Sequence, residues 1–415
     1  MPSQYRSTAS APVVIRVYGI AEIFGLKSSS EPSKRTTSAW FSRMLATLPP
    51  WVSICPRRAG NAEAAQRVSP TRTAAMSMTV AALDEFYGAA QAQPNIALVK
   101  YWGKRDVALN LPVVGSLSIT LDSLWTRTEV RFAPGSTQDR ISLNGRSDEA
   151  AVRRVVNCLD LLRQRAGVDW GAAVESHNNF PTAAGLASSA SGFAALVCAG
   201  ARALHLDLSE TDLSRLARRC SGSAARSIFG GYVEWARGEL ADGSDSVAHP
   251  LLPPNAWPLR VAVAITSTAA KEVGSSEGMR RTAQSSPFQA SWIATQDADL
   301  GMARNAILTR DFEALALVSE HSCLKMHALA LAAEPGLLYW NGATVECMHR
   351  VRALRREGVP VFFTVDTGPQ LKAVCTAQAV GQVKAALREV PGVLDVLDSG
   401  LGAGVRSISF EELSA

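Results

Sequence analysis

The sequence feature that most constrains the fold is a turn of small residues between a strand-like and a helix-like stretch. It occupies residues 178–192 and consists of NNFPTAAGLASSASG. The preceding GAAVESH alternates like a half-buried strand, and residues 183–204 are rich in strong helix formers. A helix that begins inside such a turn presents free N–H groups and the positive end of its dipole, which attract anions. The pattern indicates either a phosphate-binding loop or a serine-capped helix start, and it contains neither a Walker A loop nor G-x-G-x-x-G.

Strand-like and helix-like stretches alternate unevenly after residue 95. Short β-patterned runs include SLSITLDSL, TRTEVRFA and DRISLNG. The run SDEAAVRRVVNCLDLLRQRAG has helical spacing, with Ser147 in the N-cap position and Gly167 as its stop. Buried strands are predicted near residues 260 and 360, with a largely helical segment between them. Because the helices are clustered rather than strictly alternating with strands, the pattern favours an α+β fold over a doubly wound sheet.

Charge separates the first 78 residues from the rest of the chain. Residues 1–78 hold 10 Lys and Arg against 3 Asp and Glu, whereas the remainder holds 32 against 34. The nearly neutral remainder predicts no basic face for nucleic acid, and the lack of an 18-residue apolar run predicts no membrane-spanning helix. The first 78 residues, rich in Ser, Thr, Arg and Ala, suggest disorder or a targeting leader. We favour a dispensable tail, or a start of translation at Met76 or Met78.

Cysteine and histidine spacing predicts no metal site built from side chains. The six histidines form no H-x-x-x-H pair, and no two cysteines are spaced C-x-x-C. The scattered cysteines favour a reducing cytoplasm, and most are expected to be small buried hydrophobic residues. The seven are Cys55, Cys158, Cys198, Cys220, Cys323, Cys347 and Cys375.

Four stretches, one of them the turn of residues 178–192, occur in order along the chain. They are PNIALVKYWGKRD, NNFPTAAGLASSASG, SGSAARSIFGGYVEW and FFTVDTGP. Together, over residues 94–415, they resemble the diphosphomevalonate decarboxylases of the GHMP kinase superfamily. The resemblance implies a GHMP kinase fold with two α/β-sandwich domains, expected at 79–265 and 266–415, and an active site in the cleft between them. It also implies a cytoplasmic homodimer.

The resemblance implies a two-step reaction on mevalonate 5-diphosphate. ATP, with Mg²⁺, phosphorylates the tertiary 3-hydroxyl, and loss of that phosphate and of CO₂ then yields isopentenyl diphosphate. By position, the ATP loop comprises Pro181, Ala184, Gly185, Leu186, Ala187, Ser188 and Ser189. The substrate-binding residues are Tyr101, Lys104, Ser221, Ser223, Arg226 and Ser276. The catalytic residues are Asn95, Lys100, Arg226 and Asp366.

Each implied role has a chemical reason. Asp366 is expected to orient or deprotonate the 3-hydroxyl, with Lys100 close enough to keep it ionised, although D-x-G-P alone would be a simple turn. Arg226 and Lys100 supply the positive charge that a departing phosphate and a carboxylate require. Asn95 is expected to hold neighbouring side chains. A bend at Gly103 could bring Tyr101 and Lys104 together.

This sequence departs from the family motif at a few positions. Gly115 and Ser191 replace a serine and an alanine, and Ala225 replaces a cysteine. Cys220 replaces a glycine, and we interpret it as structural because no partner cysteine is close to it in sequence. Two alternatives remain: a relative that acts on mevalonate or its 5-phosphate, and a non-catalytic sensor with the same fold. The retained catalytic residues argue against both.

Overall fold

The computed structural model describes residues 85–145, 148–180 and 188–414, which all belong to one unit. The predicted leader and the loop residues Pro181 and Ala184 to Ala187 lie outside the described residues. No helix within these described ranges has the length and apolar character needed to cross a bilayer.

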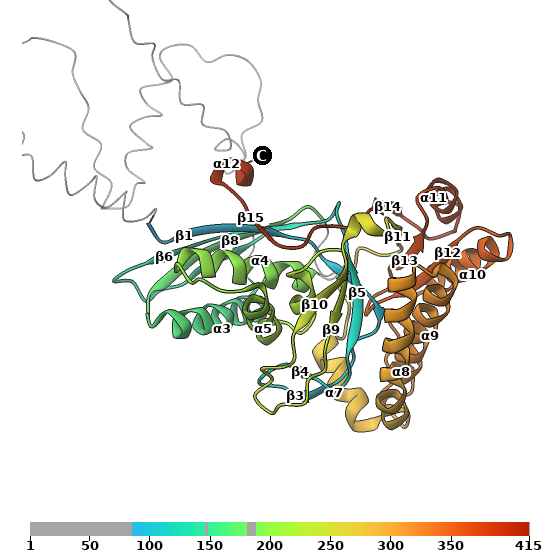
Figure 1. Ribbon diagram of the computed structural model, residues 1–415, viewed down its shortest axis with the longest axis horizontal. Helices are drawn as coiled ribbons and strands as arrows, with labels where there is room; N and C mark the ends of the chain where they lie inside the picture. Colours follow the sequence, from blue (N-terminus) through green and yellow to red (C-terminus); the bar gives the residue numbers. More distant parts are fainter. Residues whose placement is uncertain (1–84, 146–147, 181–187, 415) are drawn as a thin grey trace, which may run out of the picture. The chain divides into compact units, whose positions relative to one another are not determined.

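A five-stranded sheet with the order β15-β1-β6-β8-β7 forms the first layer. Its strands are β1 (Tyr87–Ala92), β6 (Thr126–Ala133), β7 (Arg140–Leu143), β8 (Gly171–Asn178) and β15 (Arg406–Ser407). All neighbours are antiparallel except β7 and β8. Side chains of β6 alternate between buried and half-buried, as the sequence pattern predicts. Helix α4 (Ser188–Ala203) packs on β1 and β6 of this sheet, and α3 (Glu149–Ala166) and α5 (Glu210–Cys220) pack against α4 (Figure 1).

The ends of α3 show one sequence prediction that is wrong and one that is confirmed. The N-cap is Asp148 rather than Ser147, because the Asp148 side chain accepts a hydrogen bond from the Ala151 N–H. Gly167 ends the helix in the left-handed region, with φ of 70°. Serine and aspartate are both favourable N-cap residues. The predicted start of the helix is therefore wrong by one residue only.

A second sheet, with the order β10-β9-β5-β2, carries the first catalytic candidates. Its strands are β2 (Asn95–Val99), β5 (Ser116–Thr120), β9 (Tyr232–Trp235) and β10 (Ala248–Leu252). The segment after β2 leads into a small hairpin of β3 (Lys104–Asp106) and β4 (Leu111–Pro112), and the short helix α6 (Ala224–Ser227) precedes β9. Gly103 has φ of 97°, which confirms the predicted bend between Tyr101 and Lys104.

The third sheet is antiparallel, with the order β12-β13-β11-β14. Its strands are β11 (Arg260–Ile265), β12 (Val361–Val365), β13 (Leu371–Cys375) and β14 (Asp395–Ser399), which confirms the buried strands predicted near 260 and 360. The helices of this part are α7 (Ser275–Ser285), α8 (Gln289–Thr309), α9 (Phe312–Leu331), α10 (Gly342–Arg356) and α11 (Val380–Arg388). The short segments η2 (Pro254–Ala256) and α12 (Phe410–Ser414) complete the described elements.

Helix α9 joins the second and third sheets because it packs on both β2 and β12; Figure 1 shows it beside β12. Most of its buried positions are apolar, as expected for a helix covered on two sides, but Ser319, Glu320, Ser322 and His327 are also buried. This packing places the C-terminal ends of β2 and β12 near each other, and Lys100 and Asp366 directly follow these two strands. The predicted α+β fold is confirmed.

Candidate active site

One cavity of about 930 Å³ brings the predicted site residues together. Its wall comes from the segment after β2, from α3, from the α5–α6 junction, from the start of α7 and from the turn after β12. Every predicted site residue within the described part of the chain lines it. These residues are Asn95, Lys100, Tyr101, Lys104, Ser188, Ser189, Ser221, Ser223, Arg226, Ser276 and Asp366.

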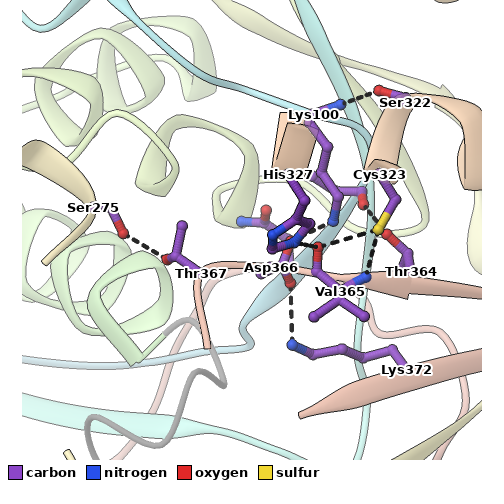
Figure 2. Close-up of polar contacts among 12 residues, drawn as sticks. Lys100, Ser275, Ser322, Cys323, His327, Thr364, Val365, Asp366, Thr367 and Lys372 are labelled. Carbon is purple, nitrogen blue, oxygen red and sulfur yellow. Dashed lines mark hydrogen bonds and ion pairs between the residues drawn. The ribbon is translucent and has the colours of Figure 1, made fainter. Parts of the chain in front are cut away.

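Asp366 lies between two buried lysines (Figure 2). Lys100 Nζ is 2.6 Å from Asp366 Oδ1, and Lys372 Nζ is 3.3 Å from Oδ2. Both lysine side chains are 1% exposed, whereas Asp366 is 24% exposed. Burial alone would raise the pKa of this carboxyl, but the two lysines outweigh burial and hold the pKa well below its usual range. Asp366 is therefore ionised, and the predicted proximity of Lys100 is confirmed.

The D-x-G-P turn does not account for the Asp366 side chain. The turn itself is closed by the backbone, since Gly368 N–H donates to the Asp366 carbonyl at 2.9 Å. The carboxylate instead pairs with the lysines and lines the cavity. An Asp that served only the turn would use its side-chain oxygens on nearby backbone N–H groups.

Lys372 is a charged partner of Asp366 that sequence reasoning missed. It lies on β13, directly opposite Thr364 of the neighbouring strand β12. Asp366 follows the C-terminal end of β12. Burial lowers the pKa of its ammonium group, and Asp366 acts in the opposite direction. A signal was present in the sequence, because a lysine inside the otherwise apolar strand LKAVC has to find a buried counter-charge.

Helix α9 fixes the strand end that carries Asp366 (Figure 2). Its Cys323 Sγ accepts a hydrogen bond from Val365 N–H at 3.1 Å, and its Ser322 Oγ accepts one from Lys100 N–H at 3.0 Å. His327 Nε2 lies 3.2 Å from the Val365 carbonyl. Burial, followed by the charge of Lys100, lowers the pKa of His327 to about 3. His327 is therefore neutral and donates this hydrogen bond.

Arg226 is held in place by Asn95. The Asn95 Oδ1 atom accepts hydrogen bonds from Arg226 Nε at 3.2 Å and Nη2 at 3.0 Å, and Ser116 Oγ accepts one from Nη1 at 2.5 Å. The Asn95 amide donates to the Ser223 carbonyl and to Ser227 Oγ, so both ends of its side chain are used. Burial lowers the pKa of Arg226 to about 10, with Asp366 acting against it, so the guanidinium remains cationic at neutral pH.

Tyr101 offers an unused hydrogen-bonding group to the cavity. Its hydroxyl is buried and has no hydrogen-bond partner in the described part of the chain. Burial raises its pKa, so the group is a neutral phenol that can donate. Lys104 lies beyond the Gly103 bend and lines the same cavity, and burial lowers the pKa of its ammonium group.

Further cations that sequence reasoning did not predict line the cavity. Lys271 Nζ donates to Ser275 Oγ at 3.1 Å and to Thr367 Oγ1 at 3.1 Å, beside the turn that carries Asp366. The full set of cationic lining residues is Lys100, Lys104, Arg154, Arg219, Arg226 and Lys271. The acidic lining residues are Glu277 and Asp366. Six cations against two carboxylates make a cavity suited to a ligand with several negative charges.

Two family models match this chain in succession. The diphosphomevalonate decarboxylase-like N-terminal domain matches residues 92–248, and the mevalonate 5-diphosphate decarboxylase C-terminal domain matches residues 261–399. The chain belongs to the diphosphomevalonate decarboxylase family. The predicted family and enzyme class are thereby confirmed.

Curated relatives and solved structures agree with this family. The diphosphomevalonate decarboxylase of Ganoderma lucidum is 40% identical over 307 residues, which are 68% of this chain and 77% of the relative. The Homo sapiens protein of the same name is 38% identical over 71% of this chain and 78% of its own length. The structure of mevalonate diphosphate decarboxylase from Staphylococcus aureus has a TM-score of 0.74 and 40% identity, and covers 78% of this chain and 98% of that protein.

A further solved structure shows a relative with its ligands. It is described as MDDEF in complex with MVAPP, AMPPCP and magnesium. It has a TM-score of 0.73 and 40% identity to this chain, and covers 78% of this chain and 99% of that protein. The family membership and this complex support the predicted activity, ATP-dependent decarboxylation of mevalonate 5-diphosphate, with ATP and Mg²⁺ as the predicted cofactors.

Proposed function

We propose that the described cavity carries out ATP-dependent decarboxylation of mevalonate 5-diphosphate, with Asp366 at its chemical centre. The observation that carries the proposal is an ionised carboxylate held between two buried lysines in a cavity of mainly positive charge. The cations suit a diphosphate and a triphosphate bound together, whereas the carboxylate suits a neutral hydroxyl placed between them.

Asp366 orients the 3-hydroxyl rather than acting as a strong base. A carboxylate whose pKa lies well below the usual range has little affinity for a proton, but it accepts a hydrogen bond from an alcohol. Phosphoryl transfer depends mainly on positioning and on neutralising charge, so a strong base is not required. Lys271, beside the same turn, is placed to balance the charge of the transferred phosphoryl group.

The substrate diphosphate is bound by hydroxyl and ammonium groups of the cavity wall. The Tyr101 hydroxyl supplies a donor that the described protein leaves unused, and Lys104 supplies charge. The serines stand at helix ends: Ser221 caps α5, Ser223 precedes α6, and Ser276 lies in the first turn of α7. The first turn of α7, an 11-residue helix, presents free backbone N–H groups in addition to its serine hydroxyls.

The described residues fit ATP with Mg²⁺ at the start of α4. Ser188 and Ser189 line the cavity in the first turn of this 16-residue helix. No three His, Cys, Asp or Glu side chains cluster in the described ranges, which fits an ion held mainly by phosphate oxygens and water. Bound Mg²⁺ would supply charge neutralisation between the phosphates. The serine hydroxyls and the α4 amides would hold the nucleotide phosphates.

Arg226 and Lys100 assist the departure of phosphate and CO₂. Both are cationic groups at the cavity wall, and the planar guanidinium of Arg226 matches a carboxylate or a phosphate in two-point geometry. Loss of the phosphate from C3 leaves positive character on that carbon, which the nearby negative charge of Asp366 stabilises. Asn95 is a positioning residue, because both ends of its side chain hold protein groups.

Three broader predictions remain proposals. The division into domains at 79–265 and 266–415 is supported in outline by two successive family models, although these meet between residues 248 and 261, a few residues before the predicted boundary. A cytoplasmic location is supported by the free thiols of the six described cysteines. Sedimentation of the purified protein would test the homodimer.

Substrate specificity is tested by three parallel incubations. The protein is given ATP and Mg²⁺ with mevalonate, mevalonate 5-phosphate or mevalonate 5-diphosphate, and trapped CO₂ is measured. We expect CO₂ release from the 5-diphosphate alone, with no release when ATP is omitted. Equal release from the 5-phosphate, or a phosphorylated product without CO₂, would contradict the proposed reaction.

A further inference from the structure

Two thiols that are far apart in sequence meet at the wall of the cavity. Cys158 lies on α3 and Cys220 is the last residue of α5, and their sulfur atoms are 2.8 Å apart. Both residues line the cavity. Cys158 is fully buried, whereas Cys220 is partly exposed. The sequence showed no nearby partner for Cys220 and led us to interpret it as structural, whereas packing of α3 on α5 supplies a partner thiol from a distant segment.

A cation lies beside this thiol pair. Arg154 is one helical turn before Cys158 on α3 and lines the same cavity, and it interacts electrostatically with both thiols. Its guanidinium carbon is 4.6 Å from the centre of the Phe193 ring, which fixes the side chain along the wall. Burial and the neighbouring Cys220 thiol raise the pKa of Cys158 well above its usual range, and the charge of Arg154 acts in the opposite direction. The site therefore combines a reachable thiol, a neighbouring thiol and a cation.

We propose that Cys158 and Cys220 are a reversible oxidation site that closes to a disulfide when a peroxide enters the cavity. The Cys220 sulfur attacks one peroxide oxygen, the O–O bond breaks, and the departing oxygen takes the Cys220 thiol proton, so that a sulfenic acid and water result. The Cys158 sulfur then attacks the Cys220 sulfur, the S–O bond breaks, and a second water leaves with the Cys158 proton. Two thiols are oxidised and one hydrogen peroxide is reduced to two waters. A dithiol reductant reverses the bond by exchange.

The geometry favours closure over further oxidation of Cys220. A disulfide has an S–S length of about 2.05 Å, so the sulfurs need only a small additional approach from 2.8 Å. The remaining half-buried thiol in the described core, Cys198, lies on α4 in a different surface hollow lined by no other cysteine. Its oxidation rate therefore serves as an internal reference for a thiol of this protein that has no neighbouring thiol in its hollow.

The proposed substrate should shield the pair. Cys220 directly precedes Ser221, which caps α5 and is assigned to the substrate diphosphate. This expectation rests on the proposed function, because it requires mevalonate 5-diphosphate to occupy the cavity. Disulfide formation itself does not depend on that assignment, so the two can fail separately.

Peptide mass mapping of the folded, full-length protein tests the proposal. The protein is treated with hydrogen peroxide, quenched with an alkylating agent and digested. We expect a linked 158–220 peptide that forms at least tenfold faster than oxidation of Cys198 and disappears with dithiothreitol. Mevalonate 5-diphosphate should slow its formation at least fivefold. Loss of this protection alone would contradict the substrate assignment and leave the disulfide standing.

Matched variants separate the roles of the two thiols. Cys220→Ala should leave Cys158 unmodified, because that residue is buried, whereas Cys158→Ala should convert Cys220 to sulfinic and sulfonic acids. Cys198→Ala should leave the linked peptide unchanged. Thermal melting followed by circular dichroism checks that each variant is folded. If Cys220→Ala does not fold, Cys220→Ser replaces it in the same experiment. A peroxide-treated parent protein without the 158–220 peptide, or with Cys220 joined to a different cysteine, would overturn the proposal.

Discussion

Asp366→Asn removes one negative charge from the site with almost no change of shape. The parent carboxylate is the counter-charge of Lys100 and Lys372, which are both 1% exposed. Removing one partner from a buried ion pair typically costs about 3–5 kcal/mol, because a charge is left buried without compensation. Asp366 is 24% exposed, so water reaches part of the site. We therefore expect the free energy of unfolding at pH 7 to fall by about 3 kcal/mol.

The stability loss should shrink as the pH rises. Burial already lowers the pKa of Lys372, and losing Asp366 removes the group that opposes this effect. In the variant, the folded protein therefore releases its lysine proton at a pH well below the value of about 10.4 for an unfolded chain. Between these two values the unfolded state binds more protons, so the free energy of unfolding rises with pH. Urea unfolding of parent and variant at pH 7 and pH 9.5 measures the difference between their free energies of unfolding, which should be smaller at pH 9.5.

Turnover should fall much more than substrate binding. Losing the group that orients the 3-hydroxyl should lower the rate by about 10²-fold or more, and losing the charge near C3 adds to this. Calorimetry gives the affinity for mevalonate 5-diphosphate, and CO₂ release at saturating ATP gives turnover. Turnover within threefold of the parent would refute the role assigned to Asp366.

Asp398→Asn is the matched control for this experiment. Asp398 on β14 also has two cationic partners, with Arg260 at 2.7 Å and Lys384 at 3.1 Å. It is not among the described residues that line the cavity. The control should keep turnover within twofold of the parent, which separates loss of the catalytic carboxylate from loss of any paired carboxylate.

Three further predictions follow from the charges and the chain organisation. Lys372→Met should lower turnover and raise the pKa of Asp366, so the acid limb of the pH–rate profile should move to higher pH; an unmoved limb would exclude Lys372 from the site. Arg226→Gln should lower turnover by at least tenfold while ATP affinity changes less than threefold, and the reverse pattern would place Arg226 in the nucleotide site. Deletion of residues 1–75, which precede both family-model matches, should leave melting temperature and turnover unchanged, and insoluble or inactive protein would contradict this.

Local sequence patterns predicted much of the fold because they report on local physics. The alternation in β6, the left-handed Gly167 and the bend at Gly103 depend on nearby residues alone. The buried strands near 260 and 360 were visible as apolar runs. The N-cap of α3 was misplaced by one residue because Ser147 and Asp148 are both good caps, and only the backbone geometry decides between them.

The cavity wall was only partly predictable because some of its residues meet through packing between distant segments. Motif residues were found because the family resemblance carries their positions. Lys271 and Arg154 lie outside those motifs and become site residues only when α7 and α3 reach the cavity. The Cys158–Cys220 contact is likewise absent from local sequence, since 62 residues separate the two thiols.

The second lysine explains how Asp366 can stay ionised through both chemical steps. Lys100 has two roles in the proposed reaction, because it pairs with Asp366 and also lines the cavity in which that reaction would build up phosphate charge. Lys372 is not a lining residue of the described cavity and is buried on the far oxygen of the carboxylate. When Lys100 turns its charge toward a departing phosphate, Lys372 still holds the pKa of Asp366 down. The carboxylate can then keep the negative charge that a cationic C3 requires, which a single lysine serving both groups could not ensure.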